Sequence, residues 1–437
     1  MTEPSARAVA PAGRATTTFH RVVNRFGAID AVLHSAGPRR SATVVVYTHP
    51  REQSSLTEYP CPDLAARGID VFAFNNRFTN SPAGTDMATI FEAFALDVGA
   101  AVQHVRALGY RHVLLLGWSA GGPVMAFYQH VAERGDAALS PHALDRFPGF
   151  RDPHGRELRL PPADGLVLRS VTIGTAASFL IRLDGAVIDE VTGATDPGLD
   201  IYRAENGWNP LTGAATYAPD FLRRVYRAQA LRMNRLVDET LTRLEDIGRG
   251  RGRFADDDFL VIQRTRANPT TVDLALAARG SREAPVYPDG ALDIPVSTRP
   301  VNHEYRQNGD AAGAAVHKLR SLLSYRLVRV DPDRFDPLAT SPEASGIDSR
   351  TTNTSTTAAL ARVAVPVLVI QGTGDESNSV KIPTAEQNAA SCGGPDTTLA
   401  FVQGGMHNMT PVDARFGDTR AIAADVMAGW IRARYPA

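Results

Sequence analysis

The sequence predicts an α/β protein in which a mostly parallel, doubly wound sheet carries a large, mainly helical insertion. Three observations lead to this prediction. Short apolar runs alternate with helical patterns up to residue 174, the alternation stops over residues 175–364, and it returns over residues 365–437. Such alternation is typical of a parallel sheet with helices on both faces. We therefore expect a sheet domain in two parts, 19–174 and 365–437, with the insertion 175–364 between them.

The first elements along the chain are predicted to start the sheet. Residues 1–18 lack the continuous apolar run of a secretion signal and are interpreted as a disordered tail. Two strands of a hairpin are expected within residues 19–36. Apolar runs at 43–47 and 70–75 predict buried strands, with a short helix at 61–67 between them.

A helical pattern at 87–108 leads to the stretch with the clearest chemical signal. Residues 112–116 predict a buried strand, residues 117–121 read Gly-Trp-Ser-Ala-Gly, and a helical pattern follows at once. In a G-x-S-x-G turn between strand and helix, the serine is strained and its hydroxyl is exposed. A match of five residues is weak in a chain with 36 glycines, but the flanking strand and helix make it specific. Ser119 is thus a predicted nucleophile, and the N–H of Ala120 at the helix start a predicted oxyanion donor.

The remaining strands of the sheet are predicted at 165–171, 365–371 and 397–402, and a helix at 418–434 follows them. No carboxylate occurs at 170–178, whereas Gly-Thr-Gly-Asp follows the second strand and Gln-Gly-Gly-Met-His follows the third. An imidazole can take a serine proton near neutral pH, and a buried carboxylate can orient that imidazole. His407 is the predicted base and Asp375 the predicted acid. Glu376 remains an alternative acid, because strand register cannot be fixed to one residue from sequence.

The insertion has less regular patterning than the sheet domain. An apolar stripe predicts one long helix over 220–247, and such a stripe usually packs against a core. A strand at 259–263, a Pro-rich stretch at 284–300 and a helix within 313–325 are also expected. A Ser/Thr-rich passage at 351–357 precedes the return to the sheet.

The order Ser119, Asp375, His407, each after a predicted strand, resembles that of the α/β-hydrolase superfamily. The resemblance implies the α/β-hydrolase fold, with the insertion as a cap or lid over the serine. It also implies a second oxyanion N–H from the loop after the strand at 43–47. That loop reads His49-Pro50-Arg51, and Pro50 has no N–H to give.

Arg51 is therefore the predicted second donor, and the alternative is a loop residue that pairs with a surface acid. His49 and Trp118 are predicted to contact the substrate. Within this superfamily, haloalkane dehalogenases and epoxide hydrolases have an aspartate at the equivalent position. The serine at position 119 therefore argues against these two activities. Ala120 argues against cofactor-free perhydrolases, which typically carry methionine.

These residues predict a serine hydrolase that cleaves a carboxylic ester or lactone of a small to medium organic substrate through an acyl-enzyme. Three alternatives stay open. The same triad could hydrolyse a thioester or an amide, it could cleave a C–C bond of a β-diketone type, or the fold could serve a ligand-binding protein without turnover.

Composition restricts the partners and cofactors that we expect. The chain has 46 basic and 47 acidic side chains, so its charge does not favour a nucleic-acid or anionic-membrane partner. Its only cysteines are Cys61 and Cys392, which exclude a disulfide framework and offer no metal-ligand cluster. We expect a small-molecule substrate, no metal or other cofactor, no membrane span and a cytoplasmic location, with no prediction of the oligomeric state.

Overall fold

The computed structural model of the chain describes most of its residues. These are 16–24, 27–37, 41–50, 54–77, 79, 90–140, 150–152, 154–265, 267–277, 315–339, 345–375, 377 and 382–436. The strands of the sheet domain are β1 (Thr16–Asn24), β2 (Gly27–Ser35), β3 (Thr43–Tyr47), β4 (Asp70–Phe74), β5 (His112–Trp118), β6 (Gly165–Arg169), β11 (Val367–Gly372) and β12 (Thr397–Val402). The helices beside them are α1 (Cys61–Ala65), α2 (Phe94–Ala107), α3 (Gly121–Arg134), α10 (Thr356–Leu360), α11 (Ile382–Ala390) and α12 (Thr419–Arg434).

These strands form one sheet in the order β1-β2-β4-β3-β5-β6-β11-β12. Strand β2 pairs antiparallel with β1 and β4, and every pairing from β4 to β12 is parallel. From β3 the chain adds β4 on one side in the sheet and then β5, β6, β11 and β12 on the other side, as in a doubly wound sheet. An antiparallel second strand followed by this parallel order is the topology of the α/β-hydrolase fold, so the predicted fold class is confirmed.

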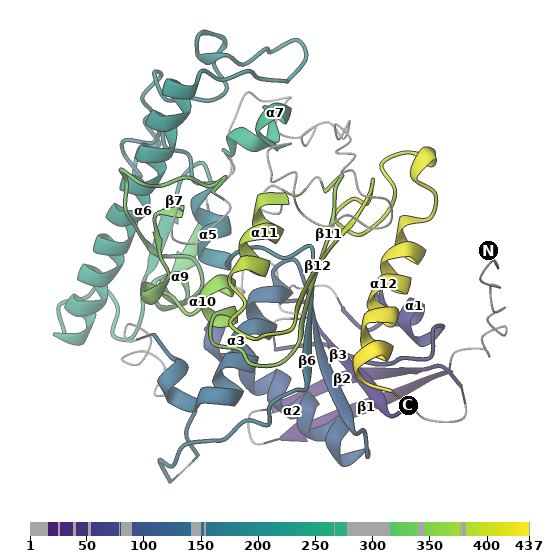
Figure 1. Cartoon of the computed structure of the whole chain (residues 1–437). Coiled ribbons are helices and arrows are strands. Elements are labelled where there is room, and N and C mark those ends of the chain that lie inside the picture. The colour runs from purple at the N-terminus through teal and green to yellow at the C-terminus, as the bar shows by residue number, and fades with distance from the viewer. Residues whose placement is uncertain are drawn as a thin grey trace.

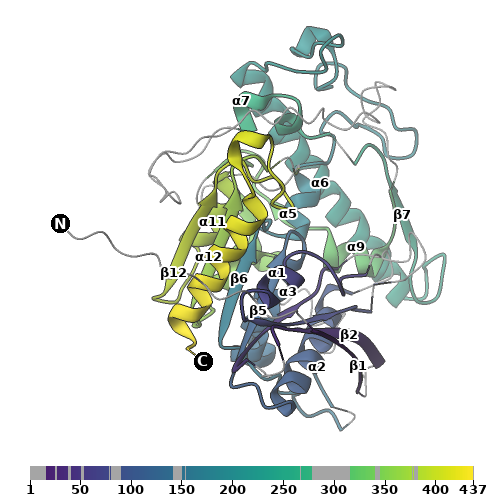
Figure 2. The ribbon, with the colours of Figure 1, turned by 90° about the vertical axis from the view of Figure 1, so that its right-hand side faces the viewer.

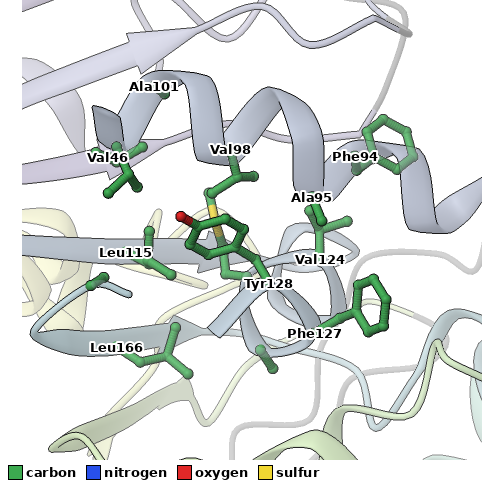
Figure 3. Packing of buried hydrophobic residues seen from close by; sticks show 14 of the residues in the cluster. Val46, Phe94, Ala95, Val98, Ala101, Leu115, Val124, Phe127, Tyr128 and Leu166 are labelled. Carbon is green, nitrogen blue, oxygen red and sulfur yellow. The ribbon is translucent and has the colours of Figure 1, made fainter. Parts of the chain in front are cut away.

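Helices cover both faces of the sheet (Figures 1 and 2). One face packs on α2, α3, α10 and α11, and the other packs on α1 and α12. The buried strands alternate between the two sides, since Val44 and Val46 of β3 enter the first cluster while Val45 and Tyr47 enter the second. Figure 3 shows the first cluster, where Val98 of α2 and Tyr128 of α3 pack above Leu115 of β5.

A second group of elements lies between β6 and β11 in the chain. It comprises α5 (Thr175–Leu180), α6 (Pro219–Gly248), β7 (Phe259–Ile262), α7 (Leu274–Ala277), β8 (Ala315–Lys318), α9 (Leu319–Tyr325), β9 (Arg329–Val330) and β10 (Ile347–Asp348). Helix α6 stands beside the sheet domain in Figure 1 and extends one residue beyond the predicted range at each end. Its apolar stripe is buried in a hydrophobic cluster of residues between 176 and 335. The stripe therefore serves packing, as its spacing indicated.

Two predicted helices begin later than their patterns indicated. The prediction of a helix from residue 87 is wrong at residue 90, because Ile90 is extended and a 3₁₀ turn at Phe91–Ala93 precedes α2. The N–H of Phe91 is bound by the hydroxyl of Ser324 at 2.9 Å, so a side chain of α9 caps this start. The helix predicted within 313–325 begins only at Leu319. Residues 315–318 instead pair with β7, which offers them a strand edge.

The strand predicted at 165–171 is also shorter than expected. It ends at Arg169, because Ser170 adopts a φ of 49° that no strand residue can have. The early end of β6 brings the main chain of residues 169 and 170 against the turn after β5, which is the site described next.

Candidate active site

The turn after β5 holds Ser119 in a strained conformation. Its φ is 52°, a left-handed value that is rare for a residue with a side chain. Its N–H donates to the carbonyls of Arg169 at 3.2 Å and Ser170 at 3.1 Å. A Cβ on Gly117 would lie 2.6 Å from the Cα of Gly122, so only glycine lets the strand and helix α3 approach this closely. The local sequence therefore fixes the serine between strand and helix, as expected of a nucleophile elbow.

The imidazole of His407 and the carboxylate of Asp375 are in contact. The Nδ1 atom lies 3.1 Å from Oδ1 and 3.0 Å from Oδ2. The carboxylate is buried and also accepts hydrogen bonds from Nε2 of Gln371 at 2.9 Å and from the N–H of Ser377 at 2.8 Å. A carboxylate surrounded by donors is stabilised in its ionised form. It can thus orient the imidazole and stabilise the imidazolium.

The loops that carry these two side chains are joined through their main chains. A Cβ on Gly372, at the end of β11, would lie 2.1 Å from the carbonyl oxygen of Gly405. The N–H of Gly404 is bound by the hydroxyl of Thr373 at 2.9 Å, and the N–H of Gly374 donates to Gly405 O at 3.0 Å. The glycines flanking both loops therefore allow the close approach that brings Asp375 to His407.

Trp118 connects the serine turn to the histidine loop. Its Nε1–H donates to the carbonyl of His407 at 3.0 Å, and its ring lies 5.3 Å from the imidazole centroid. The same indole also lies 5.1 Å from the ring of His49. Since Trp118 immediately precedes Ser119, this contact brings the serine turn and the histidine loop together. The structure thus gathers Ser119, His407, Asp375, Trp118 and His49 at the carboxyl ends of the parallel strands.

His49 belongs to the loop after β3, which closes against the start of α3. A Cβ on Gly121 would lie 3.0 Å from the carbonyl oxygen of Thr48. The main chain of His49 is held by Ser55, whose Oγ accepts from its N–H at 3.2 Å, and by Asn76, whose Nδ2 donates to its carbonyl at 2.8 Å. This loop therefore borders the turn that holds Ala120, the first of the two predicted oxyanion donors.

The predicted oxyanion donors have different outcomes. Ala120 immediately precedes α3, so its N–H belongs to the group at the positive end of that helix. Arg51 lies outside the described residues, as does Glu376, the alternative acid. Their roles stay predictions, as do the contacts of His49 and Trp118 with a substrate.

The sequence reasoning missed two polar residues that support the site. Gln371 holds the carboxylate of Asp375, and Arg169 lies fully buried at the end of β6. Both stand in otherwise apolar strands, VLVIQG and GLVLR. A polar side chain in a strand covered on both faces is itself a signal, because its burial is costly unless it is bound.

The described residues also bear on metals and membranes. Within them, no group of three or more His, Cys, Asp and Glu side chains is arranged to hold a metal ion. None of the helices that the structure describes is both long and apolar enough to cross a bilayer.

Comparisons with known proteins give likenesses in structure alone. No family model matches the chain, and no curated protein matches it in sequence. The siderophore hydrolase EstB from Aspergillus fumigatus superposes with a TM-score of 0.46 at 11% identity over 98% of this chain and 100% of that one. Brefeldin A esterase, described as a bacterial homologue of human hormone sensitive lipase, gives 0.42 at 14% identity over 98% and 79%.

A thioesterase domain from the curacin biosynthetic pathway gives a TM-score of 0.38 at 11% identity over 95% of this chain and 99% of that one. At these values the likeness adds no argument about activity or substrate. The fold assignment rests on the order and directions of the strands of this chain. These three proteins are described as a hydrolase, an esterase and a thioesterase domain.

Proposed function

We propose that the protein is a serine hydrolase that cleaves a carboxylic ester or a lactone of a small to medium organic substrate. One observation carries the proposal: the strained Ser119 lies beside a histidine loop whose imidazole is in contact with both oxygens of a buried carboxylate. Trp118 makes this connection through its hydrogen bond to the carbonyl of His407. Nucleophile, base and acid are the three groups that acyl transfer to a serine requires.

In the proposed mechanism the carboxylate of Asp375 holds Nδ1–H of His407, so that Nε2 acts as the base. As the Oγ of Ser119 attacks the ester carbonyl, its proton passes to Nε2 and a C–O bond forms. The oxyanion is stabilised by the N–H of Ala120 and by a second donor from the loop after β3, for which we propose Arg51. The imidazolium then protonates the leaving alkoxide, and a water activated by His407 hydrolyses the acyl-enzyme.

Labelling with a fluorophosphonate tests the nucleophile directly. We expect the label on the peptide that contains Ser119, and we expect Ser119→Ala to abolish both labelling and ester turnover. Ser391→Ala is a matched control, because Ser391 lies just after α11 and its hydroxyl donates to the carbonyl of Gln387 in that helix. Label on another residue, or turnover that survives Ser119→Ala, would refute the proposal.

The bond that is cleaved is tested with a panel of p-nitrophenyl esters, a lactone, a thioester, an amide and a vinylogous β-diketone. Ester hydrolysis through an acyl-enzyme predicts a burst of p-nitrophenol when deacylation is slow. Turnover of the diketone alone would favour C–C bond hydrolysis, and binding without any turnover would favour a ligand-binding protein. The proposal includes a small-molecule substrate and a cytoplasmic location, which the composition predicts.

A further inference from the structure

Arg169 occupies a position in the sheet where an apolar side chain is expected. It ends β6 and is fully buried, at 0% exposure. Two residues earlier on the same side of the strand, Val167 packs in the cluster under α1 and α12. In the register of β5 and β6, Arg169 is the direct partner of Trp118. Arg169 is therefore a strand residue that lies directly beside Trp118, which precedes the proposed nucleophile.

The guanidinium is held by aromatic rings rather than by a carboxylate. Its central carbon lies 4.7 Å from the ring of Trp118 and 4.8 Å from the ring of Tyr59, and Nη2 donates to the carbonyl of Tyr59 at 3.4 Å. Its Nε and Nη1 find no hydrogen-bond partner among the described residues. Arg232, which is equally buried, instead binds Glu190 with Nε at 2.6 Å and Nη2 at 2.7 Å. A buried cation without such a partner costs several kcal/mol, whereas an aliphatic side chain would avoid that cost.

The groups whose charges act on Arg169 come from three other segments: Tyr47 on β3, Tyr59 and Cys61 around α1, and Asp375 after β11. Burial raises the pKa of Tyr59 and of Cys61 far above neutrality, so both stay protonated. The phenol of Tyr47 donates its proton to Glu58 at 2.9 Å. Of the four, Asp375 is thus the anion.

Arg420 of α12 adds a second positive charge near Tyr59, with its guanidinium carbon 5.2 Å from that ring. Burial lowers the pKa of Arg169, but an arginine keeps its proton in proteins. Arg169 and Arg420 therefore both contribute positive potential on this side of the sheet.

The indole of Trp118 relates this charge to the proposed base. It lies 4.7 Å from the guanidinium carbon of Arg169 and 5.3 Å from the imidazole of His407, so the guanidinium and the imidazole are within about 10 Å of each other. Among the described residues, those in contact with the imidazole include Asp375 and Trp118, and the indole of Trp118 also contacts His49. At this separation in a protein interior, a charged side chain can influence whether its neighbour takes up a proton.

We propose that Arg169 is a positioning residue of the candidate active site: it holds the indole of Trp118, and with it the main chain of His407, while its charge favours the neutral imidazole and the ionised Asp375. The kinetic part of this inference rests on the proposed function. A nearby positive charge opposes protonation of the imidazole and favours ionisation of the carboxylate. Both effects favour the form of the pair that accepts the serine proton.

The test separates the charge of Arg169 from its planar contact with Trp118. Arg169→Met removes both. We expect the acid limb of the pH profile of kcat/KM, measured with a p-nitrophenyl ester, to move upward by about one pH unit, because the imidazolium is no longer disfavoured. Arg169→Lys keeps the positive charge but loses the planar guanidinium that stacks on the indole. We expect it to lower kcat several-fold and to leave the acid limb within about 0.3 unit of the wild-type profile.

Arg232→Met is the matched control, since it removes an equally buried arginine whose guanidinium binds Glu190 instead. We expect it to destabilise the protein without moving the acid limb. An unchanged acid limb in folded Arg169→Met would overturn the inference. If Arg169→Met does not fold, Arg169→Lys still decides, because wild-type kcat in that variant would rule out the positioning role.

A measurement that does not need turnover distinguishes failure of this inference from failure of the proposed function. In a Ser119→Ala background, the titration of the His407 imidazole can be followed by NMR, with His407→Gln to assign its signal among the eleven histidines. We expect its midpoint to rise when Arg169→Met is added. An unshifted midpoint would overturn the role of Arg169 even if the hydrolase proposal holds, and a shifted one supports it even if no ester is cleaved.

Discussion

The packing of Gly122 against Val171 makes a quantitative prediction about the serine turn. Gly122 is the second residue of α3, and a Cβ there would lie 2.0 Å from Cγ1 and 2.5 Å from Cγ2 of Val171. Carbon atoms in contact are about 3.5–4.0 Å apart, so Gly122→Ala must displace the buried valine or the helix by about 1.5 Å or more. Overpacking of a core costs about 1–3 kcal/mol, and the helix preference of alanine returns at most about 1 kcal/mol. We expect a net loss of about 1–2 kcal/mol in the free energy of unfolding.

The same displacement should reach the proposed nucleophile. Val171 follows Ser170, whose carbonyl accepts the N–H of Ser119, so a shift of this segment moves the serine and should lower kcat. Urea unfolding followed by circular dichroism gives the stability, and an ester assay gives kcat. Gly429→Ala is the control, because a Cβ at that position of α12 meets no atom within 4 Å, and we expect it to be neutral or slightly stabilising.

The variant Val171→Ala completes the test of this contact. If the clash is the cause, the double variant should be more stable than the sum of the two single effects by about 1–3 kcal/mol. The reasoning is refuted if Gly122→Ala is as stable as Gly429→Ala, or if Val171→Ala gives no relief.

Three further predictions follow from contacts and pKa shifts. Asp375→Asn should lower kcat by about 10²–10⁴ with little loss of folded protein, since the imidazole loses the charge that stabilises its protonated form; a rate near wild type in an ester assay would contradict this. Trp118→Phe keeps an aromatic ring but deletes the donor to the carbonyl of His407, so it should cost about 0.5–1.5 kcal/mol in unfolding experiments and reduce kcat; an unchanged kcat would show that this bond does not hold the loop. Burial, with the charge of Arg326, lowers the pKa of His317 to about 4. Between pH 6.5 and about 4, this imidazole is therefore neutral in the folded state but protonated in the unfolded state. About 3 kcal/mol of stability should then be present above pH 6.5 and be lost as the pH falls towards 4, and urea midpoints of His317→Gln should depend less on pH over this range, an equal dependence being the contrary result.

The sheet could be predicted because its strands are short apolar runs with clear ends. The run at 43–47 has no polar face, and the structure buries every residue of β3. The turn at Gly117 and Gly121 could be recognised because steric demands allow few residues there, and the φ of Ser119 meets them. These are local constraints, so a single sequence reveals them.

Elements that depend on distant partners could not be predicted in the same way. Residues 315–318 have a helical pattern, but pairing with β7 overrides it. Helix α11 was missed because its residues, IPTAEQNAA, lack an apolar run, although six of its nine residues are buried between β11 and its neighbours. The support that Gln371 gives to Asp375 was missed for a related reason: the strand reads as apolar, and only the fold shows what its last polar residue meets.

The arrangement of the loops in the candidate site depends more on close contacts between main-chain atoms than on the side chains of Ser119, Asp375 and His407. Gly117 lets α3 pass β5, and Gly372 lets the loop after β11 contact the loop after β12. Each contact is made by backbone atoms that a Cβ would displace by an ångström or more, so a glycine-to-alanine change there moves whole loops. By contrast, loss of one carboxylate leaves the loops in place and removes only a charge. Variants at Gly117 or Gly372 should therefore lose stability and activity together, whereas Asp375→Asn should lose activity alone, and that difference separates the frame of the site from its chemistry.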